Sequence, residues 1–122
     1  ANTETTSYNT YADGYGLTKS LMIWFWDQYV PNRADRNHPL ASPLRAASYA
    51  NLPPAHFLIA GYDVLYDEAQ AYATALAKAG VPVTIQEHPG SLHGFVHFCT
   101  PFDEATRAQE RLSTAIARAF QT

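Results

Sequence analysis

The sequence predicts an α/β fold in which two parallel strands are joined by a helix. Residues 56–61 form a continuous apolar run, and residues 83–88 alternate between apolar and polar side chains. A stretch rich in strong helix formers separates them and ends before Gly80. Parallel strands need such a crossover, and two of them do not make a stable sheet alone. We therefore expect the chain to be part of a larger α/β domain.

The chain opens with residues 1–16, which are rich in Thr, Asn, Ser and Tyr and follow no helical or strand period. This composition predicts an initial loop, followed by one domain portion over residues 17–122. Thr18 is a suitable N-cap and Pro31 a helix terminator, so we expect a helix over residues 19–29. Met22 and Trp26 share one of its faces. Either this apolar helix is buried in the core, or the Met22 and Trp26 face lines a pocket for an apolar substrate.

The remaining elements follow from breakers, caps and apolar periodicity. Prolines at 39, 43, 53 and 54 predict irregular structure over residues 32–54. The strand at 56–61 is expected to be covered on both faces, whereas the strand at 83–88 is a candidate edge. The tail begins with a capping box at residues 100–103. Its apolar stripe predicts a helix face that docks on a sheet, formed by Leu112, Ala115, Ile116, Ala119 and Phe120.

Composition excludes several classes of protein. The chain has 122 residues, 47% hydrophobic and 16% charged, with a formal net charge of −3 and no basic block, which argues against a nucleic-acid partner. Its longest apolar run, residues 21–26, is too short for a membrane span. A single cysteine, Cys99, rules out an internal disulfide framework. The sequence starts at Ala1 without a methionine or signal region, so we expect any targeting segment to lie upstream.

Two titratable side chains stand directly after the predicted strands: Asp63 after the first and His93 after the second. In an open α/β sheet, ligands bind at the carboxyl ends of the strands. A carboxylate that orients an imidazole is the supporting half of a nucleophilic catalytic site. The alternatives are a turn aspartate bonded to local backbone amides and a histidine with no function in a loop.

Two other interpretations use the same region. His93 and His97 are spaced i, i+4 with His88 nearby, which could suit a metal, but the His-Glu-x-x-His motif and paired cysteines are absent from the sequence. Cys99 could be a nucleophile, yet it lies among apolar residues, where a buried structural thiol is expected. Neither explains why an acid and an imidazole follow successive strands.

The motif residues resemble a known family. Asp-Val-Leu-Tyr-Asp-Glu (63–68), Ala-Lys-Ala-Gly-Val-Pro-Val (77–83) and His-Pro-Gly-Ser-Leu-His-Gly-Phe (88–95) are similar to the C-terminal part of hormone-sensitive-lipase-like carboxylesterases, which have the α/β-hydrolase fold. Further similarity lies at residues 16–18, 24–29, 39–44 and 52–54. The chain departs from the family's usual Asp-Pro-Leu-Arg-Asp, since Val64 replaces proline and Tyr66 replaces arginine. These changes keep the carboxylate of Asp63.

The resemblance implies carboxylic ester hydrolysis by a Ser-His-Asp triad through an acyl-enzyme, with no cofactor. Asp63 is then the triad acid and His93 the base, and Leu65 is a weaker candidate for the pocket wall. The family's Gly-x-Ser-x-Gly elbow and oxyanion loop are not in this sequence. The expected partners are therefore an upstream polypeptide that carries both and a small ester substrate. The alternative is a non-catalytic structural or interaction module derived from an α/β-hydrolase.

Overall fold

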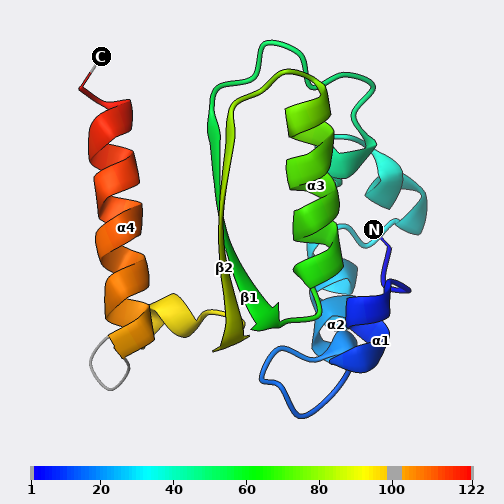
Figure 1. Cartoon of the computed structure of the whole chain (residues 1–122). Coiled ribbons are helices and arrows are strands. Elements are labelled where there is room, and N and C mark those ends of the chain that lie inside the picture. Colours follow the sequence, from blue (N-terminus) through cyan, green and yellow to red (C-terminus); the bar gives the residue numbers. More distant parts are fainter. Residues whose placement is uncertain (1, 99–102, 122) are drawn as a thin grey trace.

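A computed structural model describes residues 2–98 and 103–121 of the chain (Figure 1). The order of helix, strand, helix, strand and helix predicted for residues 17–122 is confirmed. The regular elements are α1 (Thr6–Thr10), α2 (Lys19–Tyr29), β1 (Ala55–Tyr62), α3 (Tyr66–Lys78), β2 (Val83–Leu92) and α4 (Asp103–Ala119). Three short 3-10 helices, η1 (Arg33–Asn37), η2 (Pro43–Arg45) and η3 (Phe95–His97), occupy the connections.

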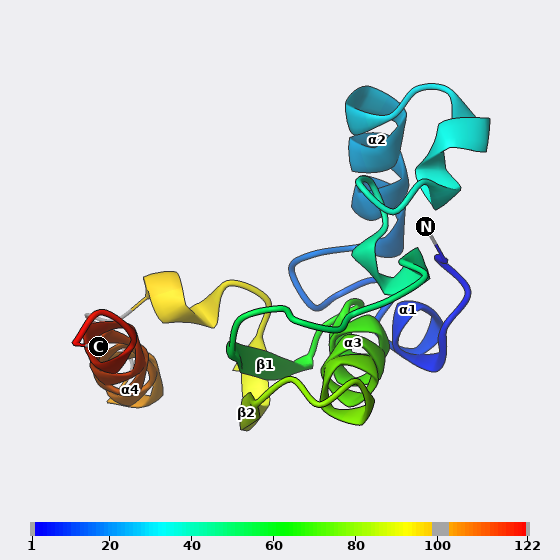
Figure 2. The same cartoon turned by 90° about the horizontal axis from the view of Figure 1, so that it is seen from above.

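The two strands pair in parallel, so their carboxyl ends lie at the same edge of the sheet. The register runs regularly from Ala55 opposite Val83 to Ala60 opposite His88. It then shifts, and Tyr62 lies opposite Leu92. Pro89 sits at this irregularity and has no backbone N–H for the ladder. Helix α3 lies beside one face of the sheet and α4 stands on the other side (Figures 1 and 2).

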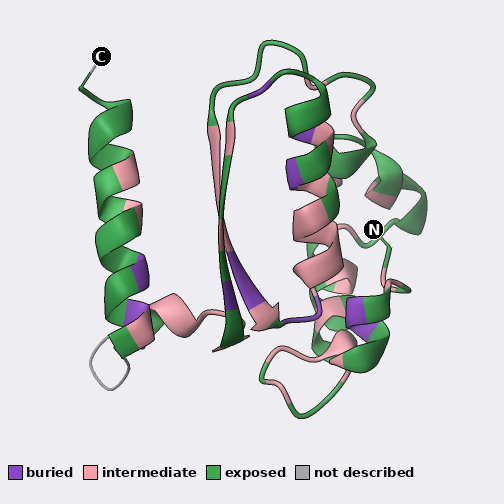
Figure 3. Cartoon of the chain, viewed as in Figure 1, coloured by how far each residue is buried: buried purple, intermediate pink, exposed green. Residues whose placement is uncertain are grey.

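The core of the described residues lies between β1 and α3 (Figure 3). Its buried apolar side chains come from the end of β1, the following turn, α3 and the loop after it: Ile59, Ala60, Val64, Ala73, Leu76 and Val81. Gly80 ends α3 in the left-handed conformation, at φ +82°, as its position after the helix formers predicts. The N–H of Val81 then donates to the Leu76 carbonyl at 3.1 Å, which directs the chain into β2.

The prediction of a loop over residues 1–16 was wrong for its central part, because α1 forms there. Thr5 caps the helix by accepting from the N–H of Tyr8. Ser7 and Tyr8 are buried. The Ser7 hydroxyl donates to the Val64 carbonyl at 2.7 Å, and the Ser7 N–H donates to Asp67 Oδ2 at 2.8 Å. These partners lie about sixty residues away, so local periodicity could not reveal the helix.

We expect Ser7→Ala to lower the free energy of unfolding by about 1–3 kcal/mol, because it leaves the buried Val64 carbonyl without its donor. The N–H of Asp67 also loses its acceptor, the Ser7 hydroxyl at 3.2 Å. Chemical denaturation of the complete protein measures the change. Ser113→Ala is the matched control, since this serine is exposed on α4. Equal unfolding energies for the two variants would contradict the prediction.

Helix α2 spans Lys19–Tyr29 as predicted, and Thr18 caps it by accepting from the N–H of Leu21 at 3.1 Å. None of its side chains is buried by the described residues, so the expected burial of this helix in the core stays a prediction for a larger domain. Large apolar groups are exposed instead: Leu21, Ile23, Trp24, Phe25 and Tyr29. An amphipathic pattern predicts which face needs cover but not where the cover comes from.

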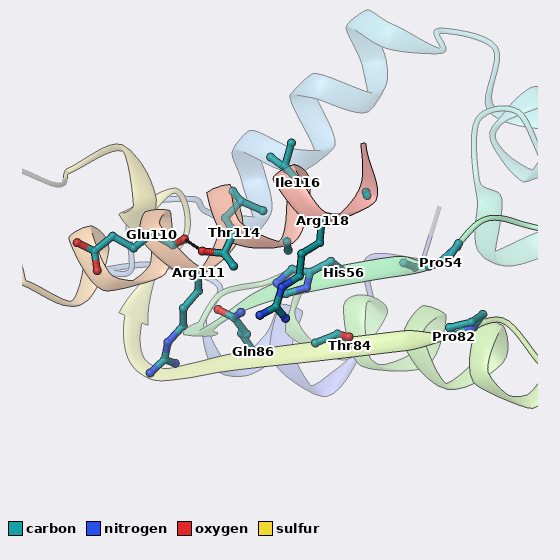
Figure 4. Close-up of a pocket in the computed structure, with 14 residues that line it drawn as sticks. Pro54, His56, Pro82, Thr84, Gln86, Glu110, Arg111, Thr114, Ile116 and Arg118 are labelled. Atoms are coloured by element: carbon teal, nitrogen blue, oxygen red, sulfur yellow. Dashed lines mark hydrogen bonds between the residues drawn. The ribbon is translucent and has the colours of Figure 1, made fainter. Parts of the chain in front are cut away.

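Helix α4 forms, but its apolar stripe does not pack on the sheet as predicted. A groove of about 620 Å³ separates the two (Figure 4). The sheet face beneath α4 carries the polar side chains of His56, Thr84 and Gln86. Two of these polar atoms, His56 Nε2 and Gln86 Oε1, are buried without a hydrogen-bond partner among the described residues. The buried residues of α4 are Ala105 and Ala108, in its first half. Cys99 and the capping box up to residue 102 lie outside the described residues.

Candidate active site

Asp63 occupies the turn from β1 into α3 and is only 8% exposed. Its Oδ1 accepts from the N–H of Leu65 at 2.9 Å, and its carbonyl accepts from the N–H of Tyr66 at 3.1 Å. The turn-aspartate interpretation is therefore correct for one carboxylate oxygen. Because that oxygen is held by the local backbone, the other oxygen, Oδ2, is fixed in direction and remains available to a residue from elsewhere in the chain.

His93 is the residue that meets Asp63 Oδ2. It follows β2, and Gly94 after it adopts the left-handed conformation at φ +72°, which turns the chain into η3. The Nδ1 atom of His93 lies 2.7 Å from Asp63 Oδ2. The parallel register thus brings together two side chains thirty residues apart in sequence, as the sequence predicts.

The hydrogen bond to Asp63 raises the pKa of His93 above its usual value, and the charge of the carboxylate adds to this, while partial burial opposes it. The His93 side chain is 45% exposed and that of Asp63 is 10% exposed. Since Nδ1 faces the carboxylate, Nε2 is the ring nitrogen left to meet another group. An imidazole held in this way can accept a proton at Nε2 while the carboxylate stabilises the resulting imidazolium.

Two cavities meet His93. One, of about 230 Å³, is lined by Asp63, Leu65 and His93 among others, so Leu65 lies beside the pair, while its role as a pocket wall stays a prediction. The other, of about 580 Å³, is largely apolar and extends from His93 along Leu17, Leu92, Phe95 and Phe98. None of these four residues was predicted to line a pocket. Nothing in the local pattern near Leu17 indicates contact with the His93 loop.

Met22 and Trp26 are not brought to this site. Among the described residues that line the two cavities at His93, neither appears. Trp26 lines a separate hollow with Ile23, Arg33 and Arg36. Their assignment to a substrate pocket stays a prediction that this arrangement does not favour.

The segment behind Asp63 is held by α1. Burial raises the pKa of the Tyr8 phenol, and the carboxylates of Glu68 and Asp63 raise it further, so Tyr8 stays protonated. Tyr8 is 1% exposed and Val64 is fully buried. This packing, with the Ser7 hydrogen bond to Val64, fixes the turn that presents the Asp63 carboxylate.

The structure does not assemble the histidines as a metal site. Within residues 2–98 and 103–121, no group of three or more His, Cys, Asp or Glu side chains could hold a metal ion. The Nδ1 atom of His88 lies 2.5 Å from Glu104 Oε1, so His88 pairs with a different carboxylate from the one that His93 meets. His97 is exposed in η3. In the same described ranges, no helix is long and apolar enough to cross a membrane.

Residues 1–97 match the family of the α/β hydrolase fold, and the chain belongs to this family. Several of the relatives it resembles are esterases. It is 39% identical over 99 residues to an ethyl acetate hydrolase of Pseudomonas putida, covering 81% of this chain and 31% of that protein. It is 38% identical over 95 residues to the carboxylic ester hydrolase LipN of Mycobacterium tuberculosis, covering 77% of this chain and 25% of that protein.

Solved structures of esterases also resemble the chain. An ester hydrolase from the metagenome of Lake Arreo is 39% identical with a TM-score of 0.89, over 98% of this chain and 38% of that one. An esterase from the fungus Rhizomucor miehei is 34% identical with a TM-score of 0.92, over 99% of this chain and 38% of that one. The chain thus spans well under half the length of the relatives it matches. The predicted resemblance to carboxylesterases of this fold is confirmed.

Proposed function

We propose that this chain supplies the acid and the base of a Ser-His-Asp triad that hydrolyses carboxylic esters. The observation that carries the proposal is the 2.7 Å contact between His93 Nδ1 and Asp63 Oδ2 at the carboxyl ends of adjacent parallel strands. Esterase relatives of the same fold support the reaction class.

In this mechanism, His93 Nε2 takes the proton of a serine hydroxyl as the serine oxygen attacks the ester carbonyl carbon. The imidazolium then gives that proton to the departing alkoxide, and an alcohol leaves. Water attacks the acyl-serine by the same route, releasing the carboxylic acid and restoring the serine hydroxyl. Asp63 holds the Nδ1–H tautomer and stabilises the imidazolium formed twice in each cycle.

The serine and the oxyanion-hole donors come, in this proposal, from a polypeptide segment that precedes Ala1 in the family's chain order. Parallel sheets need more than two strands. In the sheet that the structure describes, β1 pairs only with β2, so its second edge is open to another strand. The exposed apolar side chains of α2 likewise offer surface for such a segment to cover.

The substrate proposed is a small ester with an apolar group. The cavity beside His93 is lined mainly by Leu17, Leu92, Phe95 and Phe98. Burial of an apolar acyl or alcohol group there gains about 25 cal/mol for each Å² removed from water. Leu65 contributes to the smaller cavity on the Asp63 side.

The pH dependence of ester turnover tests this proposal. Only unprotonated His93 can act as the base, so kcat/KM should rise with pH and reach half its maximum above the ordinary histidine pKa of 6.5. Asp63→Asn should move this midpoint downwards, because the bond that raises the pKa is weakened. Intact-mass analysis after treatment with a fluorophosphonate should show one covalent adduct in the polypeptide that carries the serine. No adduct and no ester turnover would instead support a non-catalytic module.

A further inference from the structure

A second histidine–carboxylate pair lies beside the first. His88 is in β2, five residues before His93, and is only 3% exposed. Its Nδ1 atom lies 2.5 Å from Oε1 of Glu104, in the first turn of α4. Among the described residues, its Nε2 atom is buried without a hydrogen-bond partner. The Glu104 contact is therefore the hydrogen bond that compensates the buried ring, and losing it would leave both ring nitrogens unsatisfied.

Glu104 is held in place to accept this bond. Its second oxygen, Oε2, accepts from Arg107 Nη2 at 2.8 Å. Arg107 first and His88 second lower the pKa of Glu104, so the carboxylate stays ionised. Charge-assisted hydrogen bonds of this kind are stronger than neutral ones. The carboxylates of Asp103 and Glu110 also act on Arg107 electrostatically.

The pair clamps the loop that carries His93. The rings of His88 and Phe95 pack with centroids 4.7 Å apart, and Phe95 comes two residues after His93. Further along α4, Gln109 Nε2 donates to the carbonyl of Val96 at 2.9 Å. The chain is thus fastened before His93 through Glu104 and after it through Phe95 and Gln109.

We propose that His88 and Glu104, together with Gln109 of the same helix, are positioning residues for His93. The inference rests on the proposed esterase function. Nearly half of the His93 side chain is exposed, so its own packing does not fix the imidazole. Apart from the bond to Asp63, its orientation depends on the backbone on either side, which α4 holds. Glu104, Phe95 and His93 also line the same cavity, so a displacement of α4 reaches the site directly.

Steady-state kinetics of Glu104→Ala in the complete ester-hydrolysing protein test the proposal. We expect kcat to fall by about 10- to 100-fold with KM little changed, because a small misplacement of the base affects the reaction more than binding. The midpoint of the pH profile should move down as the bond to Asp63 loosens. Glu104→Gln retains an acceptor for His88 and should keep most of the activity. Ser113→Ala, which changes an exposed serine of α4, should match the unaltered protein.

Proton NMR separates this inference from the proposed function. The hydrogen between His93 Nδ1 and Asp63 should resonate far downfield, and Glu104→Ala should broaden or shift that signal whether or not esters are hydrolysed. An unchanged signal and an unchanged kcat overturn the positioning role. An equal loss of kcat in Glu104→Gln also overturns it, since charge rather than the hydrogen bond would then matter.

If Glu104→Ala does not fold, a second variant tests the proposal. Gln109→Ala removes only the surface bond to the Val96 carbonyl. We expect it to lower kcat several-fold, in the same direction and with the same downward shift of the pH midpoint, while the protein stays folded. Wild-type kcat and an unmoved midpoint in this variant overturn the proposal.

Discussion

His93→Ala in the complete protein should lower kcat for ester hydrolysis by about 10⁴-fold or more, with KM little changed. The variant lacks the only group that the proposal assigns to move the serine proton. The fold should persist, because the His93 side chain is 45% exposed and leaves no core cavity when truncated. Ester turnover with matched circular dichroism spectra measures both outcomes.

His97→Ala is the matched control. It removes an exposed imidazole from the same loop, four residues further on, and should keep normal turnover. Asp63→Asn should approach the effect of His93→Ala, since the amide favours the wrong tautomer of His93. Because triad members act as a unit, the double variant should be little worse than His93→Ala alone. A His93→Ala enzyme with near-normal kcat would end the triad assignment.

The placement of Asp63 and His93 could be predicted because it depends on local order alone. Each follows a strand, and a parallel pair joined by a helix must put both strand ends at one edge. The ends of the helices could be predicted for the same reason. Thr18, Pro31 and Gly80 act on the backbone next to them. The family resemblance added the roles that position alone left open.

Contacts between distant segments could not be predicted. Ser7 forms hydrogen bonds with Val64 and Asp67, which lie about sixty residues away in sequence. No periodic pattern around Ser7 indicates these contacts. The apolar stripe of α4 indicated a docking face, but the polar side chains of His56 and Gln86 on the sheet opposite depend on register. In the sequence, His88 was considered as a possible metal ligand. In the structure its partner is the carboxylate of Glu104 in α4.

Gly61→Ala should destabilise the protein strongly and reduce kcat together. The added methyl carbon would lie 2.6 Å from the Cα atom and 2.7 Å from the carbonyl carbon of Pro89, in the neighbouring strand. Both are backbone atoms, so the conflict is relieved only if β1 and β2 separate where their register shifts. Overpacking of this kind costs about 1–3 kcal/mol, and more where the backbone must move.

The separation would fall two residues before Asp63 and four before His93, so it should lengthen their hydrogen bond. A displacement of about 1 Å at a reacting group can cost about 100-fold in rate. Gly90→Ala is the control, because its added carbon meets nothing within 4 Å. Thermal unfolding and ester turnover of the two variants measure the difference. If Gly61→Ala unfolds and turns over like Gly90→Ala, then the close approach of the strands at Pro89 does not set the distance between the acid and the base.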